Sequence, residues 1–236
     1  MNIRKLELLS FGLTAQRDFY ANVLDLPTEL TSSGLVVQAG KTEILFKQAL
    51  TDFEGAYHFA FNIPEKQFQA AKRWITDRIQ LLHDNNGRED FESASWNSDS
   101  LYFPDAAGNI LEFIARHTLQ NQVEGGFDSR QILNVSEIGL PSENVIGLAN
   151  ELCARLGISV SKQEPNENFT PVGDEEGLLI LPVKDRIWMP DSGVPARLLS
   201  VRVTGRTNDR EWEITGVPYQ IRVRDYTLSP RSSYEG

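Results

Sequence analysis

The sequence predicts an α+β protein built from four related βαβββ units, of which the last is truncated. Two observations predict this fold class. A strand, a helix and a short strand meander follow one another twice between residues 3 and 116, and the order begins again after residue 131. Corresponding turns keep a nearly constant spacing, since Asp25 and Gly157 lie 132 residues apart and Gly40 and Gly173 lie 133 apart. Such an offset indicates an internal duplication.

The first two units fill residues 3–116. A helix is expected after Thr14, which is a good N-cap, and a second helix after Pro64, because proline favours the first turn. Apolar residues within each helix recur at helical spacing. Alternating or β-branched runs predict strands, and these cover residues 3–9, 35–39, 43–47, 56–63, 100–103 and 109–114.

Residues 119–130 lack periodicity and contain Gly125-Gly126, so they are predicted to link an N-terminal domain, 1–118, to a C-terminal domain, 131–236. The second half repeats the pattern, with a helix that Gly157 closes. Its predicted strands cover residues 132–140, 169–172, 177–181, 197–203 and 218–223. The last two are too close together for a helix, which predicts a truncated fourth unit.

The composition limits the function classes. The chain has 236 residues, 40% of them hydrophobic, and can therefore bury a substantial core. Its net charge of -10 and scattered basic residues argue against a nucleic-acid partner. No apolar run approaches the roughly 20 residues that span a bilayer, and the N-terminus does not look like a signal peptide. The single cysteine, Cys153, lies in a helical run, and we expect a cytoplasmic protein.

Two segments resemble the vicinal oxygen chelate superfamily, which includes glyoxalases, bleomycin resistance proteins and extradiol dioxygenases. The first is Asp18-Phe19-Tyr20 followed by Val23-Leu24, and the second is the closing hairpin over residues 100–113, with a Pro-Asp-Ala-Ala-Gly-Asn turn before Glu112. The family's turn has its aspartate before the proline, whereas here the order is reversed. The resemblance implies two glyoxalase-like domains in tandem, with paired units forming cups and metal ligands projecting inward.

Strand alternation selects His58 as the first candidate ligand. In residues 56–63 the bulky side chains share one face, and His58 shares the other with small residues that leave room for a ligand. The resemblance implies that Glu112 is a metal-binding glutamate. An isolated carboxylate in this apolar run is costly to bury, so Glu112 needs a partner. That partner is a divalent cation beside His58, His58 itself without metal, or an arginine.

The resemblance also implies a third ligand on the first strand of a neighbouring unit. In the first half this position is Lys5, whose ammonium group repels a cation. Counting back the same 20 residues in the second half, from Gly157 as from Asp25, gives Glu137. The alternatives for Glu137 are a surface carboxylate and an ion pair with Lys5.

Sequence alignment of the units gives Leu198 and Gln220 as the counterparts of His58 and Glu112, so neither domain holds a complete ligand set by itself. If the first strands swap between domains, His58 and Glu112 join Glu137, and all the ligands gather in one site. We therefore predict a fused pseudo-dimer with one intact site, either monomeric or further assembled into a homodimer.

One imidazole and two carboxylates suit Zn, Fe, Mn, Ni or Co. The implied function is metal-dependent chemistry of lyase, isomerase or dioxygenase type on a small metabolite with two neighbouring oxygens. The second acid argues against the extradiol type, whose members usually show two histidines. Tyr102 either offers a phenol to the substrate or packs in the core. The alternative function is metal-free binding of a small molecule, as in bleomycin resistance proteins.

Overall fold

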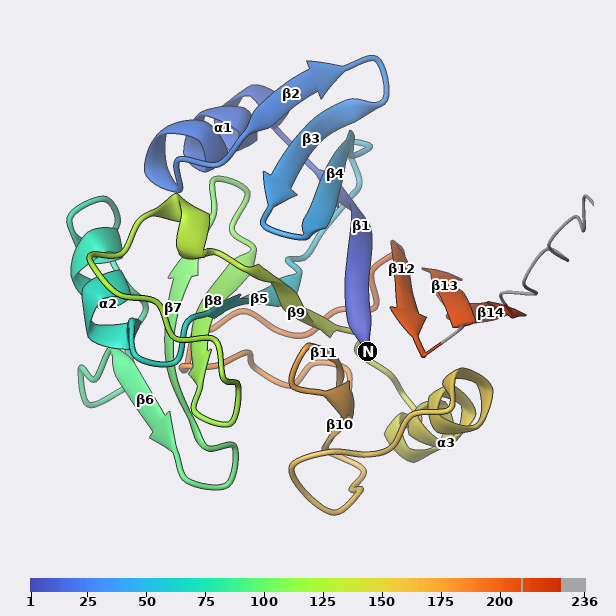
Figure 1. The fold of residues 1–236 in the computed structure, drawn as a ribbon. Helices are drawn as coiled ribbons and strands as arrows, with labels where there is room; N and C mark the ends of the chain where they lie inside the picture. Colours follow the sequence, from blue (N-terminus) through green and yellow to red (C-terminus); the bar gives the residue numbers. More distant parts are fainter. Residues whose placement is uncertain (209, 226–236) are drawn as a thin grey trace, which may run out of the picture.

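The computed structural model describes residues 1–208 and 210–225, in which two seven-stranded mixed sheets are flanked by short helices (Figure 1). Residues 226–236, the end of the predicted C-terminal domain, lie outside the described residues. The outer sheet contains, in spatial order, β14 (Gln220–Asp225), β13 (Arg210–Gly216), β12 (Val201–Thr207), β1 (Asn2–Ser10), β4 (Thr42–Gln48), β3 (Gly34–Ala39) and β2 (Thr28–Thr31). The inner sheet contains β10 (Phe169–Asp174), β11 (Gly177–Pro182), β9 (Asn134–Gly139), β5 (His58–Ile63), β8 (Ile110–Arg116), β7 (Ser98–Pro104) and β6 (Asp90–Ser93). This arrangement confirms the predicted fold class.

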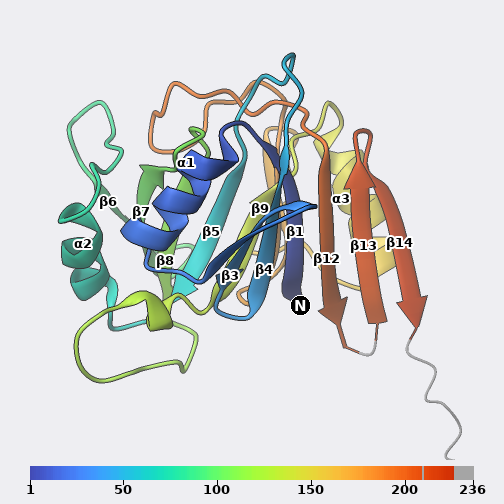
Figure 2. The ribbon, with the colours of Figure 1, turned by 90° about the horizontal axis from the view of Figure 1, so that it is seen from above.

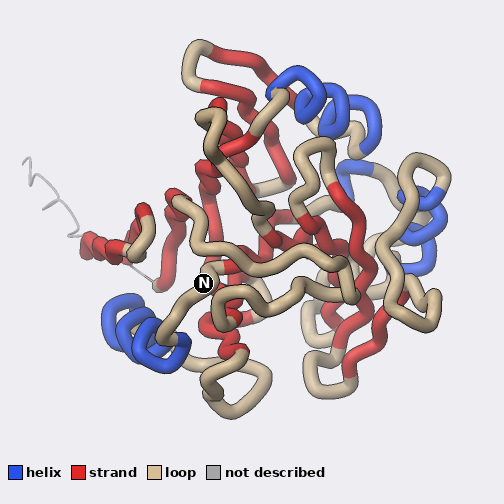
Figure 3. The backbone as a smooth tube through the Cα atoms, turned by 180° about the vertical axis from the view of Figure 1, so that it is seen from behind, coloured by secondary structure: helices blue, strands red, loops and turns tan. Residues whose placement is uncertain are grey.

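The helices lie at the periphery of the strands (Figure 3). They are α1 (Leu13–Asp18), continued by the π-helical turn η1 (Phe19–Val23), α2 (Phe68–Thr76) and α3 (Val145–Leu156), with a 3-10 turn η2 (Ser129–Gln131). The side chain of Asn144 caps α3 by accepting a hydrogen bond from the backbone N–H of Gly147 at 2.9 Å. Gly157 ends α3 in the left-handed conformation, with φ 66°, as predicted. None of the described helices combines the length and the apolar composition that crossing a bilayer requires.

Each sheet draws strands from both sides of residues 119–130. In the outer sheet, β1 pairs in parallel with β4 and antiparallel with β12. In the inner sheet, β9 pairs in parallel with β11 and antiparallel with β5, which is itself parallel to β8. The first strand of the third unit therefore lies directly beside the first strand of the second unit.

The two sheets meet where β1 and β9 lie side by side (Figure 2). The Thr42 hydroxyl donates to the Ile3 carbonyl at 2.8 Å and accepts from the backbone N–H of Val135 at 3.0 Å, so it bridges the sheets. Gly40, with φ 55°, lies against the backbone of Leu133. A Cβ atom at this position would be 2.0 Å from the Leu133 carbonyl oxygen. Only glycine permits this approach without displacement, and one continuous hydrophobic core joins the sheets.

The fourth unit is a plain meander, and the described residues from 201 to 225 contain no helix. Sequence reasoning missed β13 and began the preceding strand at residue 197 instead of Val201. The segment 183–200 connects β11 to β12, and it passes the region of β5, β7 and β8 on its way to the outer sheet (Figure 2, orange).

Candidate metal centre

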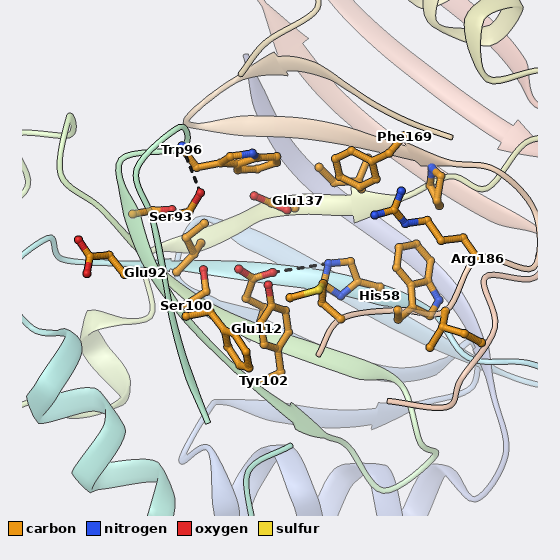
Figure 4. A pocket seen from close by; sticks show the side chains of 18 of the residues that line it. His58, Glu92, Ser93, Trp96, Ser100, Tyr102, Glu112, Glu137, Phe169 and Arg186 are labelled. Carbon is orange, nitrogen blue, oxygen red and sulfur yellow. Dashed lines mark hydrogen bonds and ion pairs between the residues drawn. The ribbon is translucent and has the colours of Figure 1, made fainter. Parts of the chain in front are cut away.

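Three adjacent strands of the inner sheet bring the predicted ligands together. Ala60 on β5 lies opposite Glu112 on β8 and opposite Glu137 on β9, so the two carboxylates flank one small residue. His58 precedes Ala60 by two residues and therefore shares its face of β5. Figure 4 shows the imidazole and both carboxylates converging on one space.

The candidate ligand atoms of His58, Glu112 and Glu137 all lie within 4.8 Å of one another. All three residues are buried, and the Nε2 atom of His58 lies 3.6 Å from Oε2 of Glu112. Bonds of about 2.1 Å to a single ion place ligand atoms about 3–4 Å apart, so small side-chain rotations would suffice. The donor set fits a divalent transition metal, and the role of these residues as ligands stays a prediction.

The backbone fixes the tautomer of His58. Its Nδ1 atom lies 3.1 Å from the carbonyl oxygen of Ile110. Because a carbonyl only accepts hydrogen bonds, Nδ1 carries the proton and the lone pair of Nε2 points toward Glu112. Metal-binding histidines are commonly oriented by such a hydrogen bond from the second ring nitrogen.

Burial perturbs all three titratable groups. It lowers the pKa of His58 to about 4, which keeps the imidazole neutral at neutral pH. It also raises the pKa of Glu112 to about 8, with the charge of Glu137 as a second cause. The pKa of Glu137 is raised by burial as well, although Arg116 opposes that shift. A divalent cation between the carboxylates would favour the deprotonated form of both.

Arg116 is a partner of Glu137 that sequence reasoning missed. It is fully buried at the end of β8, and its Nη2 atom donates to Oε1 of Glu137. Its Nε atom donates to Oδ1 of Asn62 at 3.1 Å, while Nη1 has no hydrogen-bond partner among the described residues. Side chains alternate between the two faces of β8, so residues 112 and 116 point to the same face. This alternation could have predicted that Arg116 lies on the face of Glu112. The predicted alternative of a Lys5–Glu137 ion pair is wrong.

Tyr102 lies on β7 directly opposite Glu112 and lines the same cavity. Its side chain is buried, and Figure 4 shows it beside Glu112. Burial, followed by the nearby charges of Glu112 and Glu137, raises the pKa of the phenol well above its ordinary value. Tyr102 is thus a neutral hydroxyl donor at the wall of the site, and its predicted catalytic role remains a prediction.

A cavity of about 330 Å³ opens above the three candidate ligands. Aromatic side chains supply much of its wall, namely Phe91, Trp96, Tyr102, Phe169 and Trp188. Trp188 stacks obliquely on His58, with ring centroids 4.9 Å apart. Trp96 and Trp188 thus line the cavity, whereas Trp212 is buried in the core. The volume suits a small metabolite.

Comparison with solved structures identifies the fold. A proposed dioxygenase from Bacillus subtilis subsp. subtilis is 14% identical to this chain, and the match covers 91% of this chain and 81% of that one with a TM-score of 0.61. This chain shares the fold of that structure.

Two further solved structures match about half of this chain. Lactoylglutathione lyase from Agrobacterium tumefaciens is 21% identical, with 51% of this chain and 96% of that one covered at a TM-score of 0.40. A fosfomycin resistance protein from Listeria monocytogenes, in complex with Mn(II), is 16% identical. That match covers 48% of this chain and 87% of the other, with a TM-score of 0.38. The fold assignment does not depend on these two partial matches. No family model matches the sequence, and no curated protein gives a significant match.

The outer sheet has a counterpart of the site in the same register. Lys5 on β1 lies opposite Thr204 on β12, and Thr204 lies opposite Glu213 on β13. Arg202 precedes Thr204 by two residues, as His58 precedes Ala60. The structural counterparts of Glu137, His58 and Glu112 are therefore Lys5, Arg202 and Glu213.

The predicted counterparts Leu198 and Gln220 are thus wrong. Leu198 precedes β12, and Gln220 lies on β14, one strand further from β12 than the expected neighbour. The cause is a change of connection, because an antiparallel hairpin strand, β13, occupies the place that the parallel strand β8 has in the inner sheet.

Proposed function

We propose that this protein is a divalent-metal-dependent enzyme that acts on a small metabolite through two neighbouring oxygens. His58, Glu112 and Glu137 would hold the ion, which would act as a Lewis acid on a bound oxygen. The observation that carries the proposal is the convergence of one neutral imidazole and two buried carboxylates at the base of a cavity. Without a cation, burial first and the charge of Glu137 second raise the pKa of Glu112, so that two ionised carboxylates at this depth are unfavourable.

The protein's own side chains would prepare the site in three ways. Ile110 orients the imidazole through its carbonyl, and Arg116 holds one oxygen of Glu137 while the other oxygen stays available. Tyr102, as a neutral phenol, would donate a hydrogen bond to a substrate oxygen. Lyase, isomerase and dioxygenase chemistry all remain within this proposal, because the fold supports each of them, although the second acid argues against the extradiol type of dioxygenase.

We also propose the domain division at residues 119–130, which places His58 and Glu112 before the linker and Glu137 after it. In that division the site belongs to both halves of the chain. This arrangement is the one expected of a fused pseudo-dimer that kept one of two equivalent sites.

Metal analysis of protein purified without chelator tests the proposal. We expect about one equivalent of a transition metal per chain, lost in His58→Ala and in Glu137→Gln. Glu213→Gln, which changes the corresponding acid in the outer sheet, is the matched control and should keep the metal. Metal retained in Glu137→Gln would remove this residue from the ligand set.

A second candidate function is metal-free binding of a small molecule. It is favoured by the Arg116–Glu137 ion pair, which already compensates one of the two carboxylates. Protein that takes up no Zn²⁺, Mn²⁺, Fe²⁺, Co²⁺ or Ni²⁺ in equilibrium dialysis, yet binds small aromatic compounds in the cavity, would support this candidate over the enzyme.

A further inference from the structure

The segment 183–200 presents a fixed edge to the cavity. Its two arms form a short ladder, in which Ala196 N–H donates to the Arg186 carbonyl at 2.8 Å and Trp188 N–H donates to the Val194 carbonyl at 3.0 Å. Arg186 and Trp188 both line the cavity, together with Ile187 and Met189.

The Arg186 guanidinium has no carboxylate partner among the described residues. Its Cζ atom lies 4.9 Å from the centroid of the Phe169 ring, and among the described residues its guanidinium donates one long hydrogen bond, of 3.4 Å, to the Asn168 carbonyl. The other two arginines near the cavity are engaged, because Arg88 pairs with Asp84 and Arg116 pairs with Glu137. Figure 4 shows Arg186 beside Phe169 at the rim above His58.

The wall between this guanidinium and the candidate ligands is suited to a flat ring. Trp96 and Phe169 pack against each other in the upper part of the cavity wall, with centroids 6.3 Å apart and ring planes tilted by 46°, and Trp188 covers His58. The buried indole N–H of Trp188 has no hydrogen-bond partner among the described residues, so a second donor stands close to Arg186 in sequence and in space.

We propose that Arg186 is the specificity-determining residue of the site and binds an anionic group of the substrate, which is a small aromatic acid carrying two neighbouring oxygens at its other end. The two neighbouring oxygens of this substrate rest on the proposed function. Its acid group is inferred from Arg186, and its ring from the aromatic wall of the cavity. A stacked guanidinium binds carboxylates well, because its planar array of donors matches two acceptor oxygens.

Arg186 can be tested without metal. We would titrate chelator-treated protein with benzoate and with benzamide, its neutral analogue of the same shape, and follow the fluorescence of the tryptophans that line the cavity. We expect benzoate to bind about tenfold more tightly than benzamide, as a charge-assisted hydrogen bond implies. The preference should vanish in Arg186→Gln.

Arg197→Gln is the matched control, since it removes one positive charge from the same segment but does not line the cavity. It should keep the preference for benzoate. Equal affinity for benzoate in the wild type and Arg186→Gln, an equal loss in Arg197→Gln, or no binding of benzoate at 10 mM would each overturn the proposal.

A second arm separates this proposal from the proposed function. In Zn²⁺-loaded protein, 3,4-dihydroxybenzoate should bind more tightly than catechol, and Arg186→Gln should remove the difference while leaving Zn²⁺ affinity unchanged. If Zn²⁺ does not bind but the preference for benzoate over benzamide still depends on Arg186, the proposed metal function fails and the anion site stands. If Zn²⁺ binds and the acid group brings no advantage, Arg186 is not the specificity residue.

Discussion

The inner and outer sheets place three residues in the same register and compensate their charges differently. In the inner sheet Glu112 and Glu137 flank Ala60, and both are buried. In the outer sheet Glu213 and Lys5 flank Thr204, so one acid of the pair is replaced by a base. In the inner set Arg116 compensates the charge of Glu137, and among the described residues Glu112 has no basic side chain paired with it except His58. The outer set contains its own cations.

The two groups of residues also differ in how deeply they are buried. Every residue of β5, β8 and β9 is buried, whereas buried residues of β12 alternate with residues that are exposed or half-buried. The ion pairs of Arg202 with Glu7 and Glu213 measure 3.8 and 3.7 Å, and the Arg202 side chain is 51% exposed. Exposed pairs of this kind contribute little to stability. The comparison teaches that the same strand register can hold a buried cluster with two acids in one sheet and a solvated ion-pair network in the other.

The largest effect should come from Arg116→Met. This change leaves Glu137 buried without its arginine, and breaking a buried pair costs about 3–5 kcal/mol of unfolding free energy. Urea denaturation of metal-free protein measures the loss, and added Mn²⁺ should restore part of it. Arg202→Met is the control and should change stability by no more than about 0.5 kcal/mol, because its exposed pairs are screened by solvent. Similar losses in both variants would end the distinction between the sheets.

Metal affinity should depend on pH through Glu112. Because the pKa of this carboxyl is raised to about 8, a metal must displace its proton at neutral pH. Apparent affinity should therefore increase up to about tenfold per pH unit below 8 and level off above it. Competition titrations with a chelating dye measure this profile. A plateau already near pH 6.5 would instead indicate that an ordinary histidine controls binding.

The stability of the metal-free protein should fall slightly between pH 6.5 and 8. The carboxyl of Glu112 holds its proton more tightly in the folded protein, where its pKa is about 8, than in the unfolded chain, where it is 4.5. The contribution of this group to the free energy of unfolding is therefore complete below pH 4.5 and is lost as the pH rises to about 8. His58 acts in the opposite direction but only between about 4 and 6.5. We expect a loss of about 1–2 kcal/mol across this window. Denaturation curves should show it in the wild type and not in Glu112→Gln.

The smallest expected effect is a weak metal site created in the outer sheet. The double change Lys5→Glu with Arg202→His would restore one imidazole and two acids around Thr204. Calorimetry should then detect a second ion, bound roughly 100-fold more weakly than the first, because no buried shell orients these ligands. Absence of any second binding event would show that the register alone does not define the site.

The sequence predicted much of the inner site and little of the outer one. Strand alternation indicated His58. The resemblance implied a ligand on the first strand of a unit, and the constant distance from that strand to the end of the helix then indicated Glu137. Arg116 was missed although the same alternation points it inward. Arg202 and Glu213 could not be found by counting, since the fourth unit changed its connection, and a hairpin strand occupies the place of a parallel one.

The most direct test of the account is to locate the metal in crystals of protein loaded with Mn²⁺, by anomalous scattering. The account predicts one strong peak per chain, bonded to Nε2 of His58 and to oxygens of Glu112 and Glu137, and none between Lys5, Arg202 and Glu213. A peak that does not involve Glu137, or no peak in the inner sheet at saturating Mn²⁺, would contradict it.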